Sequence, residues 1–472
     1  MRSKLKKFTE FANTLLPHET QYLLSIAQLE DEKKLGILER VHLNGSQINQ
    51  FTPYDTSLDK RKYSNLKNWI NKRLRQVDVD AHYAWMGEMD QKITTDRIQP
   101  AEEKKLLREI RTYAHPTFFF RRFYELVRTY RHFLLIRLRY SDHQLVNAFL
   151  ETYEDAYLES CRVDTQMHQA TQDIIKQYSA NAAESIQWER WLSRVFFDES
   201  LDGYNRYMAF VRLTFISFNY RKFDILWEKF EYLDQVFARG QSYSKRILLN
   251  YYHLRMLLHA RVRDVEQAIY YGYLSIRGKT HDYLFYVNNL SAVLLRAGRA
   301  QEALQVMRNA SQEMKDTKNF HNKIGFVAFY VKCLIANQLY KNAENYCTTF
   351  LKAYEKEVMH YRWHTFFSAY LESLLVQKKF ATMLQVMRKH KLADREAEYR
   401  RRADYLPTIS WYDAVARYQE GQLPKSELRT LLQTDLERLR QDDNRRAQLD
   451  DLLRTLKPVV PEVINYLPVW KT

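Results

Sequence analysis

The segment whose spacing comes closest to a phosphate-binding loop ends at Gly278-Lys279-Thr280. A P-loop holds phosphate oxygens on backbone N–H groups and has four residues between its two glycines. Here five residues separate Gly272 from Gly278, and the segment follows an expected helix, whereas a P-loop must leave a strand. We therefore predict no nucleotide site here. No other cofactor motif occurs, so we predict no cofactor.

Two histidines, His360 and His364, have the i, i+4 spacing of two metal ligands on one helix face. The glutamate that activates water in zinc hydrolases is absent after the first histidine, and no third ligand is apparent. Cys333 and Cys347 lack C-x-x-C spacing, which favours core packing. The chain also lacks the G-x-S-x-G and G-x-G-x-x-G motifs. We therefore predict no metal site and no enzyme.

Two basic segments contain aromatic residues. Residues 60–75 include seven basic residues and no acid, and residues 121–140 include six arginines against one glutamate. Cations interleaved with rings can contact phosphates and stack bases, which indicates a nucleic-acid patch. The alternative is that both are ordinary amphipathic helices with a solvated basic face. The candidate patch residues are Lys60, Arg61, Lys62, Lys72, Arg73, Arg75, Arg121 and Arg128.

The elements that must position these residues are helices. Only 10 glycines and 9 prolines occur in 472 residues, and no proline lies between Pro116 and Pro407. Proline interrupts helices, so this long stretch without it indicates consecutive helices joined by tight turns. A chain of this length exceeds what one core supports, and it is either several domains or a repeat array. We predict an all-α fold.

A polar turn followed by a helix recurs along the middle of the chain. Four similar sequence segments lie at 220–226, 298–304, 339–344 and 378–383, and a less similar one lies at 263–268. Each segment predicts a turn that leads into the second helix of a hairpin. Stacked hairpins of this kind bury a continuous core between neighbours.

The segment Tyr283–Ala310 resembles a tetratricopeptide repeat (TPR). Leu290 stands at the family's first-helix leucine, Gly298 at the turn between the helices, and Ala303 at the alanine where the two helices cross closely. The family's tryptophan position carries Val287. The resemblance implies an α-α hairpin solenoid, that is, a TPR-like superhelix.

Each expected hairpin has a residue at the position equivalent to Ala303. We call this residue the marker of the hairpin. Successive markers lie 42, 35, 40 and 40 residues apart, against a period of about 34 in the family. The hairpins are therefore lengthened, and the array is clearest over residues 205–392. The markers are Leu226, Ala268, Ala303, Ala343 and Met383.

The N-terminal region, residues 1–115, has a different pattern. We expect two short helices, a polar linker near 42–59, and continuous helical periodicity from Lys60 up to a new helix start at Pro100. This region either caps the array or forms a small domain.

The array itself is expected to span residues 116–405. Residues 406–472 follow as capping helices, with a charged helical stretch over 426–456 and an apolar tail that packs back onto the array. A repeat array needs such polar-faced ends to cover its terminal core.

The resemblance also implies a function, which is the binding of another protein or an acidic peptide along the concave surface of the first helices. A formal net charge of +16 favours anionic partners. In the family, an asparagine at the place of Asn289 can hold a ligand carboxylate. We predict a non-enzymatic interaction scaffold, and the alternative is a nucleic-acid-binding protein that uses segments 60–75 and 121–140. The candidate groove residues are Arg212, His253, Asn288, Asn289 and Lys332.

The expected location is the cytoplasm. Three cysteines in so long a chain are too few for a disulfide framework, which indicates reduced thiols. Polar residues interrupt the basic N-terminus, which is not typical of a signal peptide. No run of eighteen apolar residues occurs, so we predict no membrane span and a soluble protein.

Overall fold

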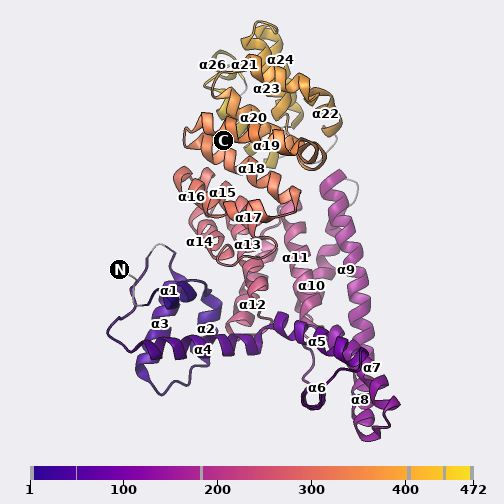
Figure 1. Cartoon of the computed structure of the whole chain (residues 1–472). Coiled ribbons are helices and arrows are strands. Elements are labelled where there is room, and N and C mark those ends of the chain that lie inside the picture. The colour runs from indigo at the N-terminus through magenta and orange to yellow at the C-terminus, as the bar shows by residue number, and fades with distance from the viewer. Residues whose placement is uncertain (1–4, 49, 181–183, 401–404, 440–442, 468–472) are drawn as a thin grey trace. The chain divides into compact units, whose positions relative to one another are not determined.

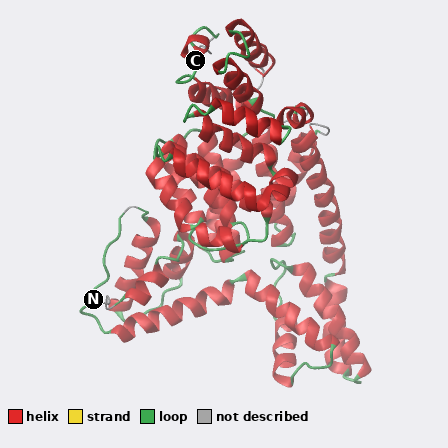
Figure 2. Ribbon diagram, turned by 45° about the horizontal axis from the view of Figure 1, so that its top comes forward, coloured by secondary structure: helices red, strands yellow, loops and turns green. Residues whose placement is uncertain are grey.

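The computed structural model describes residues 5–48, 50–180, 184–400, 405–439 and 443–467 (Figure 1). Within these residues the chain forms 26 α-helices and one short 3-10 helix, and no strand (Figure 2). The prediction of an all-α fold is confirmed.

Two compact units divide the chain. The N-terminal unit comprises residues 1–177, 182–258 and 273–278, and the C-terminal unit comprises residues 178–181, 259–272 and 279–472. Each unit has its own packing.

The N-terminal unit begins with three helices before the linker, so the expectation of two is wrong. They are α1 (Lys6–Ala12), α2 (Pro17–Ser25) and α3 (Glu32–Ser46). The extra break arises at Asp31, whose carboxylate accepts the Lys33 N–H at 3.1 Å and starts α3. Because α3 continues to Ser46, the non-helical stretch starts at residue 47 and not at residue 42. Helix α4 (Lys60–Val77) then joins the three helices around one shared core.

The helical stretch that follows residue 60 is also interrupted. Asp78 ends α4 and caps α5 (Val79–Thr94), accepting the N–H groups of Asp80 and Ala81 at 2.9 and 3.2 Å. The predicted start at Pro100 is confirmed. It opens α6 (Pro100–Arg111), where Glu102 accepts the Gln99 N–H at 3.0 Å in a capping box. Helices α5 and α6 share a core with α7 (Phe120–Ile136) and α8 (Tyr140–Thr152).

A polar network fastens the first helices to the middle of the chain. His18 on α2 places Nε2 2.9 Å from Asp234 Oδ1 and Nδ1 2.6 Å from the Tyr252 hydroxyl. The neighbouring Glu19, only 1% exposed, accepts from the Tyr243 hydroxyl at 2.6 Å and pairs with Lys245. The remaining helices that lie wholly or mainly in this unit are α9 (Glu154–Ala180), the 3-10 helix η1 (Ser185–Trp188), α10 (Glu189–Phe197), α11 (Gly203–Tyr220), α12 (Asp224–Ala238) and α13 (Lys245–Arg261).

The C-terminal unit is a succession of antiparallel helix pairs. Helix α15 packs against α16 and α18, α18 packs against α19 and α20, and α20 packs against α21 and α23. Each first helix therefore contacts its hairpin partner and the next first helix. The helices are α14 (Val265–Ser275), α15 (Tyr283–Arg296), α16 (Ala300–Asn309), α17 (Ser311–Asp316), α18 (Phe320–Ala336), α19 (Tyr340–Tyr361), α20 (Trp363–Leu375), α21 (Phe380–Lys389), α22 (Leu392–Tyr399), α23 (Thr408–Gln419), α24 (Lys425–Leu439), α25 (Asp443–Leu456) and α26 (Pro461–Ile464).

The five expected hairpins share one turn. In each, the residue five positions before the marker has a positive φ, between 56° and 75°. The next residue donates its N–H to the carbonyl five residues earlier, at 2.9 to 3.1 Å, which is the Schellman arrangement. All five markers are fully buried in the second helix. The turn residues are Arg221, Arg263, Gly298, Gln338 and Lys378.

The chain ends with three helices. The charged stretch expected over 426–456 is divided between α24 and α25, and residues 440–442 lie outside the described residues. The apolar tail packs through Val460, Val463 and Leu467, which are 0 to 5% exposed, and α26 contacts α24 and α25. The described part of the tail therefore packs against α24 and α25, and a capping role for residues 406–472 stays a prediction.

The shared turn predicts opposite effects of two substitutions. Gly298→Ala places a Cβ at φ +75°, and Gln338→Gly removes one at φ +61°. A left-handed backbone costs an L-residue about 1 kcal/mol, so we expect the first change to lower the free energy of unfolding and the second to raise it by similar amounts. Urea unfolding measures both. If the two substitutions shift the midpoint in the same direction, the turn is misassigned.

Candidate functional site

The five candidate groove residues differ in exposure. His253 and Asn288 are 2% and 4% exposed, and Asn289 is half-buried. Arg212 donates from Nε to Thr171 Oγ1 at 3.0 Å, whereas Lys332 is exposed. Arg212 and His253 belong to the N-terminal unit, and the other three belong to the C-terminal unit. A ligand-binding role for these residues stays a prediction.

The candidate basic patch divides into paired and unpaired side chains. Lys62 forms an ion pair with Asp31 at 2.5 Å, and Arg121 forms one with Asp164 at 2.7 Å. The Arg73 guanidinium lies 5.9 Å from the centroid of the Trp69 ring. The Arg128 guanidinium lies at the same distance from the centroid of the Tyr157 ring. The remaining four are exposed and have no carboxylate within 4 Å among the described residues, namely Lys60, Arg61, Lys72 and Arg75.

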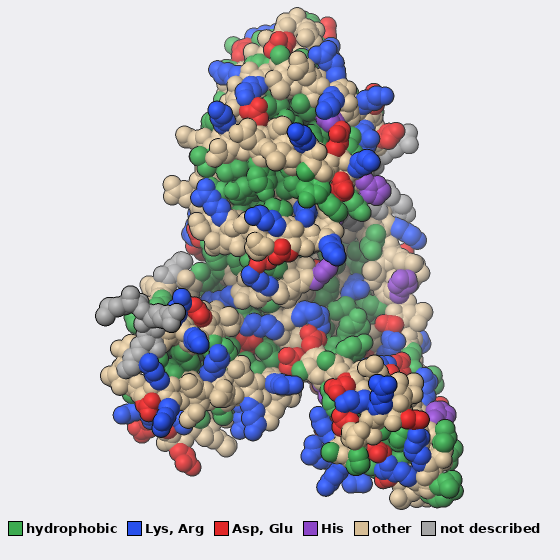
Figure 3. Space-filling model, viewed as in Figure 1, with side chains coloured by type: hydrophobic (Ala, Val, Ile, Leu, Met, Phe, Trp, Pro, Cys, Tyr) green, Lys and Arg blue, Asp and Glu red, His purple; other side chains and the backbone are tan. Residues whose placement is uncertain are grey.

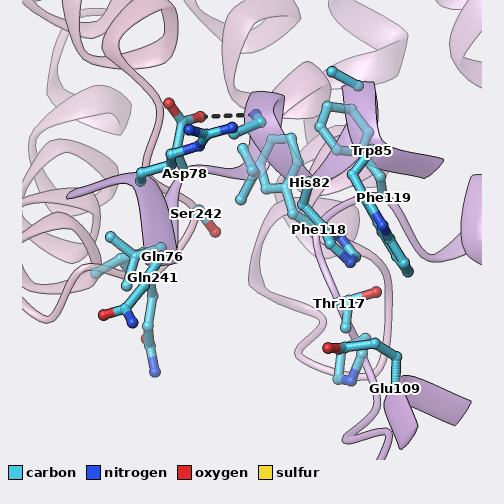
Figure 4. Close-up of a pocket in the computed structure, with 18 of the residues that line it drawn as sticks. Gln76, Asp78, His82, Trp85, Glu109, Thr117, Phe118, Phe119, Gln241 and Ser242 are labelled. Atoms are coloured by element: carbon cyan, nitrogen blue, oxygen red, sulfur yellow. Dashed lines mark hydrogen bonds between the residues drawn. The ribbon is translucent and has the colours of Figure 1, made fainter. Parts of the chain in front are cut away.

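Two of these unpaired cations line a cleft of about 1310 Å³ within the N-terminal unit (Figure 4). Its walls come from the end of α4, one face of α5, α6, the segment 116–119, the start of α11 and the end of α12. Six basic side chains line it, and we call this site the cationic cleft. They are Lys72, Arg75, Lys105, Arg108, Arg206 and Arg239.

Helical spacing builds the cleft. Lys72 and Arg75 are three residues apart on α4, and Lys105 and Arg108 are three apart on α6, so each pair lies on one helix face. Between them, the face of α5 that carries Asp78, Ala81, His82, Trp85 and Glu88 forms the floor.

Three of the four acidic groups that line the cleft are used by the fold, and the fourth, Glu109, lies 3.9 Å from Arg108. The Asp78 carboxylate caps α5, and burial raises its pKa. Glu88 pairs with Lys92 at 2.6 Å, and Glu199 accepts the Tyr232 hydroxyl at 2.9 Å.

By contrast, three cleft cations, Lys72, Arg75 and Arg239, have no carboxylate within 4 Å among the described residues. Arg108 has only a 3.9 Å contact to Glu109. The cleft therefore presents an uncompensated positive potential, which attracts anions.

The rings of the cleft are already in contact with other groups. Trp85 stacks on His82 at 5.3 Å, and the Lys105 ammonium lies 4.4 Å from its centroid. Arg206 covers Tyr232 at 5.5 Å. In Figure 4, His82, Trp85 and Phe118 gather on one side of the cleft. Burial lowers the pKa of His82, so its imidazole is neutral at pH 7 and adds no charge.

The titratable groups in and outside the cleft can be described one by one. His82 stacks on the Trp85 ring with 5.3 Å between the ring centroids. In the part of the chain that the structure describes, no group of three or more His, Cys, Asp and Glu side chains is placed to hold a metal ion. Cys333 and Cys347 are buried, and burial raises the pKa of both thiols, which keeps them protonated.

Comparison with protein-family models, curated proteins and solved structures finds no match to this chain. Among the described helices, none combines the length and the apolar character needed to cross a bilayer. The physical chemistry of the cleft therefore carries the functional inference.

Sequence reasoning found two of the six cleft cations and missed four. Lys105 and Arg108 stand in a mixed-charge helix, and Arg206 and Arg239 lie about a hundred residues or more farther along the chain. The i, i+3 spacing of basic residues on α6 was a readable signal. The sequence does not show that these α6 residues line the same cleft as those of α4, because this arrangement depends on tertiary packing.

Close packing at Gly203 makes the cleft wall sensitive to one methyl group. A Cβ there would lie 2.6 Å from the Phe118 ring and 3.2 Å from its Cα, and the Tyr204 N–H donates to the Phe118 carbonyl at 2.9 Å. We expect Gly203→Ala to lower the free energy of unfolding by about 1–3 kcal/mol, as overpacking does. Gly36→Ala, where a Cβ meets no atom within 4 Å, is the matched control and should not destabilise. Thermal melts compare the two, and equal melting temperatures would contradict the proposed contact.

Burial of His253 predicts a pH dependence of stability. Its folded pKa is lowered to about 3, against about 6.5 when unfolded. Above pH 6.5 both states are neutral. Below it only the unfolded state takes up the proton, so the residue lowers stability by about 1.4 kcal/mol per pH unit as pH falls toward 3.

The test of this dependence is His253→Leu, which should reduce the slope of unfolding free energy against pH by one proton between pH 6 and 4.5. Exposed His132→Leu is the control and should keep the parental slope. Urea unfolding across this range measures the slope. An unchanged slope in His253→Leu would show that this imidazole titrates in the folded protein.

Proposed function

We propose that this chain is a non-catalytic interaction scaffold that holds an acidic segment of another protein in the cationic cleft. One observation carries the proposal. Six basic side chains line the cleft against four carboxylates, and three of the four, Asp78, Glu88 and Glu199, are engaged by the fold. Lys72, Arg75 and Arg239 have no carboxylate partner among the described residues. A surplus of cations facing a cavity is complementary to an anionic ligand.

The arrangement suits side-chain carboxylates distributed along an extended peptide. Basic pairs on α4 and α6 line the cleft from two different helices, and Arg206 and Arg239 add cations from α11 and from the end of α12. Arginine binds carboxylates in a bidentate manner, and lysine adds a flexible point charge. Several separated cations therefore favour a ligand with several separated carboxylates.

A single-stranded nucleic acid is the second candidate. Tyr83 and Tyr204 are 46% and 37% exposed, and each packs against Phe119 of the cleft wall. Exposed rings next to cations can stack bases. The acidic peptide is favoured because the Trp85 and Tyr232 rings inside the cleft are already covered by Lys105 and Arg206.

We also infer that the hairpins form a TPR-like solenoid. The shared turn, the buried markers and the stepwise contacts of α15, α18 and α20 support this interpretation. A cytoplasmic location is part of the same proposal, since all three cysteines are free thiols, which suits a reducing compartment.

The test of cleft binding is fluorescence anisotropy with a labelled, aspartate- and glutamate-rich peptide of about fifteen residues. We expect binding that weakens with salt and falls about tenfold or more in Lys72→Glu/Arg75→Glu, because two attractive charges become repulsive. The control is Lys60→Glu/Arg61→Glu, which makes the same charge change at the other end of α4.

Two outcomes would contradict the proposal. An equal loss in the control and in the cleft variant would show that net charge, and not the cleft, attracts the peptide. Binding of a labelled oligonucleotide without binding of the peptide would favour the second candidate.

A further inference from the structure

The turn between α7 and α8 exposes a run of large apolar side chains. Leu135, Ile136, Leu138 and Tyr140 are 48%, 79%, 67% and 63% exposed. We call these four residues the apolar tip. Hydrophobic side chains also gather on the surface at the lower right of Figure 3, where α7 and α8 lie. Contiguous exposed apolar groups of this kind mark an interaction site.

The core of the α7–α8 hairpin does not need these residues. Tyr130 and Leu134 supply the buried face of α7 and are both fully buried. Leu138 has a φ of +57°, a conformation that costs a non-glycine residue about 1 kcal/mol. This left-handed conformation is that of the shared hairpin turn and belongs to the fold, whereas the exposed side chain of Leu138 is available for binding.

The backbone of the apolar tip is held in place. The Arg139 N–H donates to the Leu134 carbonyl at 3.1 Å, and the Arg139 guanidinium pairs with Asp142 at 2.7 Å. Arg137 lies 3.7 Å from the Phe133 ring and pairs with Asp96 at 2.6 Å. The side chains are therefore presented outward on an ordered turn.

We propose that the apolar tip inserts into the interfacial layer of an anionic lipid bilayer. A stable protein interface covers about 800 Å² and twenty or more residues per partner, and four side chains on a single turn fall far below this. A bilayer accepts individual apolar side chains without a complementary surface. Attachment of this kind requires no membrane-crossing helix.

The charges around the apolar tip favour anionic lipid. Arg131 donates to the Asn147 amide oxygen at 3.5 Å and has no carboxylate within 4 Å among the described residues. The Arg137–Asp96 ion pair brings the α5–α6 turn alongside, and there Arg97 is exposed with no carboxylate within 4 Å among the described residues. Basic residues near a surface are attracted to acidic headgroups.

The experiment is co-sedimentation of the full chain with vesicles of phosphatidylcholine, alone or with 30% phosphatidylserine. We expect binding to the mixed vesicles, weaker binding to the neutral ones, and a loss of about tenfold or more in Ile136→Ser/Leu138→Ser, because apolar area is removed without a change of charge. The matched control is Leu158→Ser/Phe215→Ser, which changes two residues that are 57% and 50% exposed elsewhere in the same unit. It should bind like the parent.

Three results would overturn the proposal. The first is no vesicle binding by the parent chain, and the second is an equal loss in the control variant. The third is a dimer in light scattering that Ile136→Ser/Leu138→Ser dissociates, which would assign the apolar tip to a second copy. Because the tip and the cationic cleft share no residue, a failure here leaves the peptide proposal untouched.

Discussion

The tight turn between paired helices is the constraint on which the rest of this structure depends. Each turn must reverse the chain within a few residues and still satisfy the last carbonyls of the first helix, which the left-handed residue and its backbone bond achieve. Arg221, Gln338 and Lys378 adopt this conformation although glycine would do so more easily. The burial of a marker five residues later offsets the strain, because it sits where the two helices pack most closely.

Helix ends shape the cleft in a related way. Asp78 closes α4 and caps α5, so the chain changes direction at the point where the cations of α4 approach the floor formed by α5. The contact of His18 with Asp234 and Tyr252, and that of Glu19 with Tyr243, hold α2 on α12 and α13. Buried carboxylates thus serve the fold, and Lys72, Arg75 and Arg239 of the cleft keep no carboxylate partner among the described residues.

The sequence was informative where the signal is local. Proline scarcity and helical periodicity predict the all-α fold, Pro100 with Glu102 predicts the start of α6, and polar segments predict all five turns. The breaks at Asp31 and Asp78 were missed because a single capping aspartate resembles any other surface acid. The cleft could not be predicted, because its basic residues come from three helices and from the turn after α12, and only tertiary packing brings them together.

Hydrogen exchange on the full chain, with and without a saturating acidic peptide, tests the central claim most directly. The account predicts slower exchange in the backbone around residues 72–85 and 105–119, with no change at the start of α4 or in α15 and α18. Slower exchange confined to α15 and α18 would instead place the peptide on the first helices of the C-terminal hairpins and contradict binding in the cationic cleft.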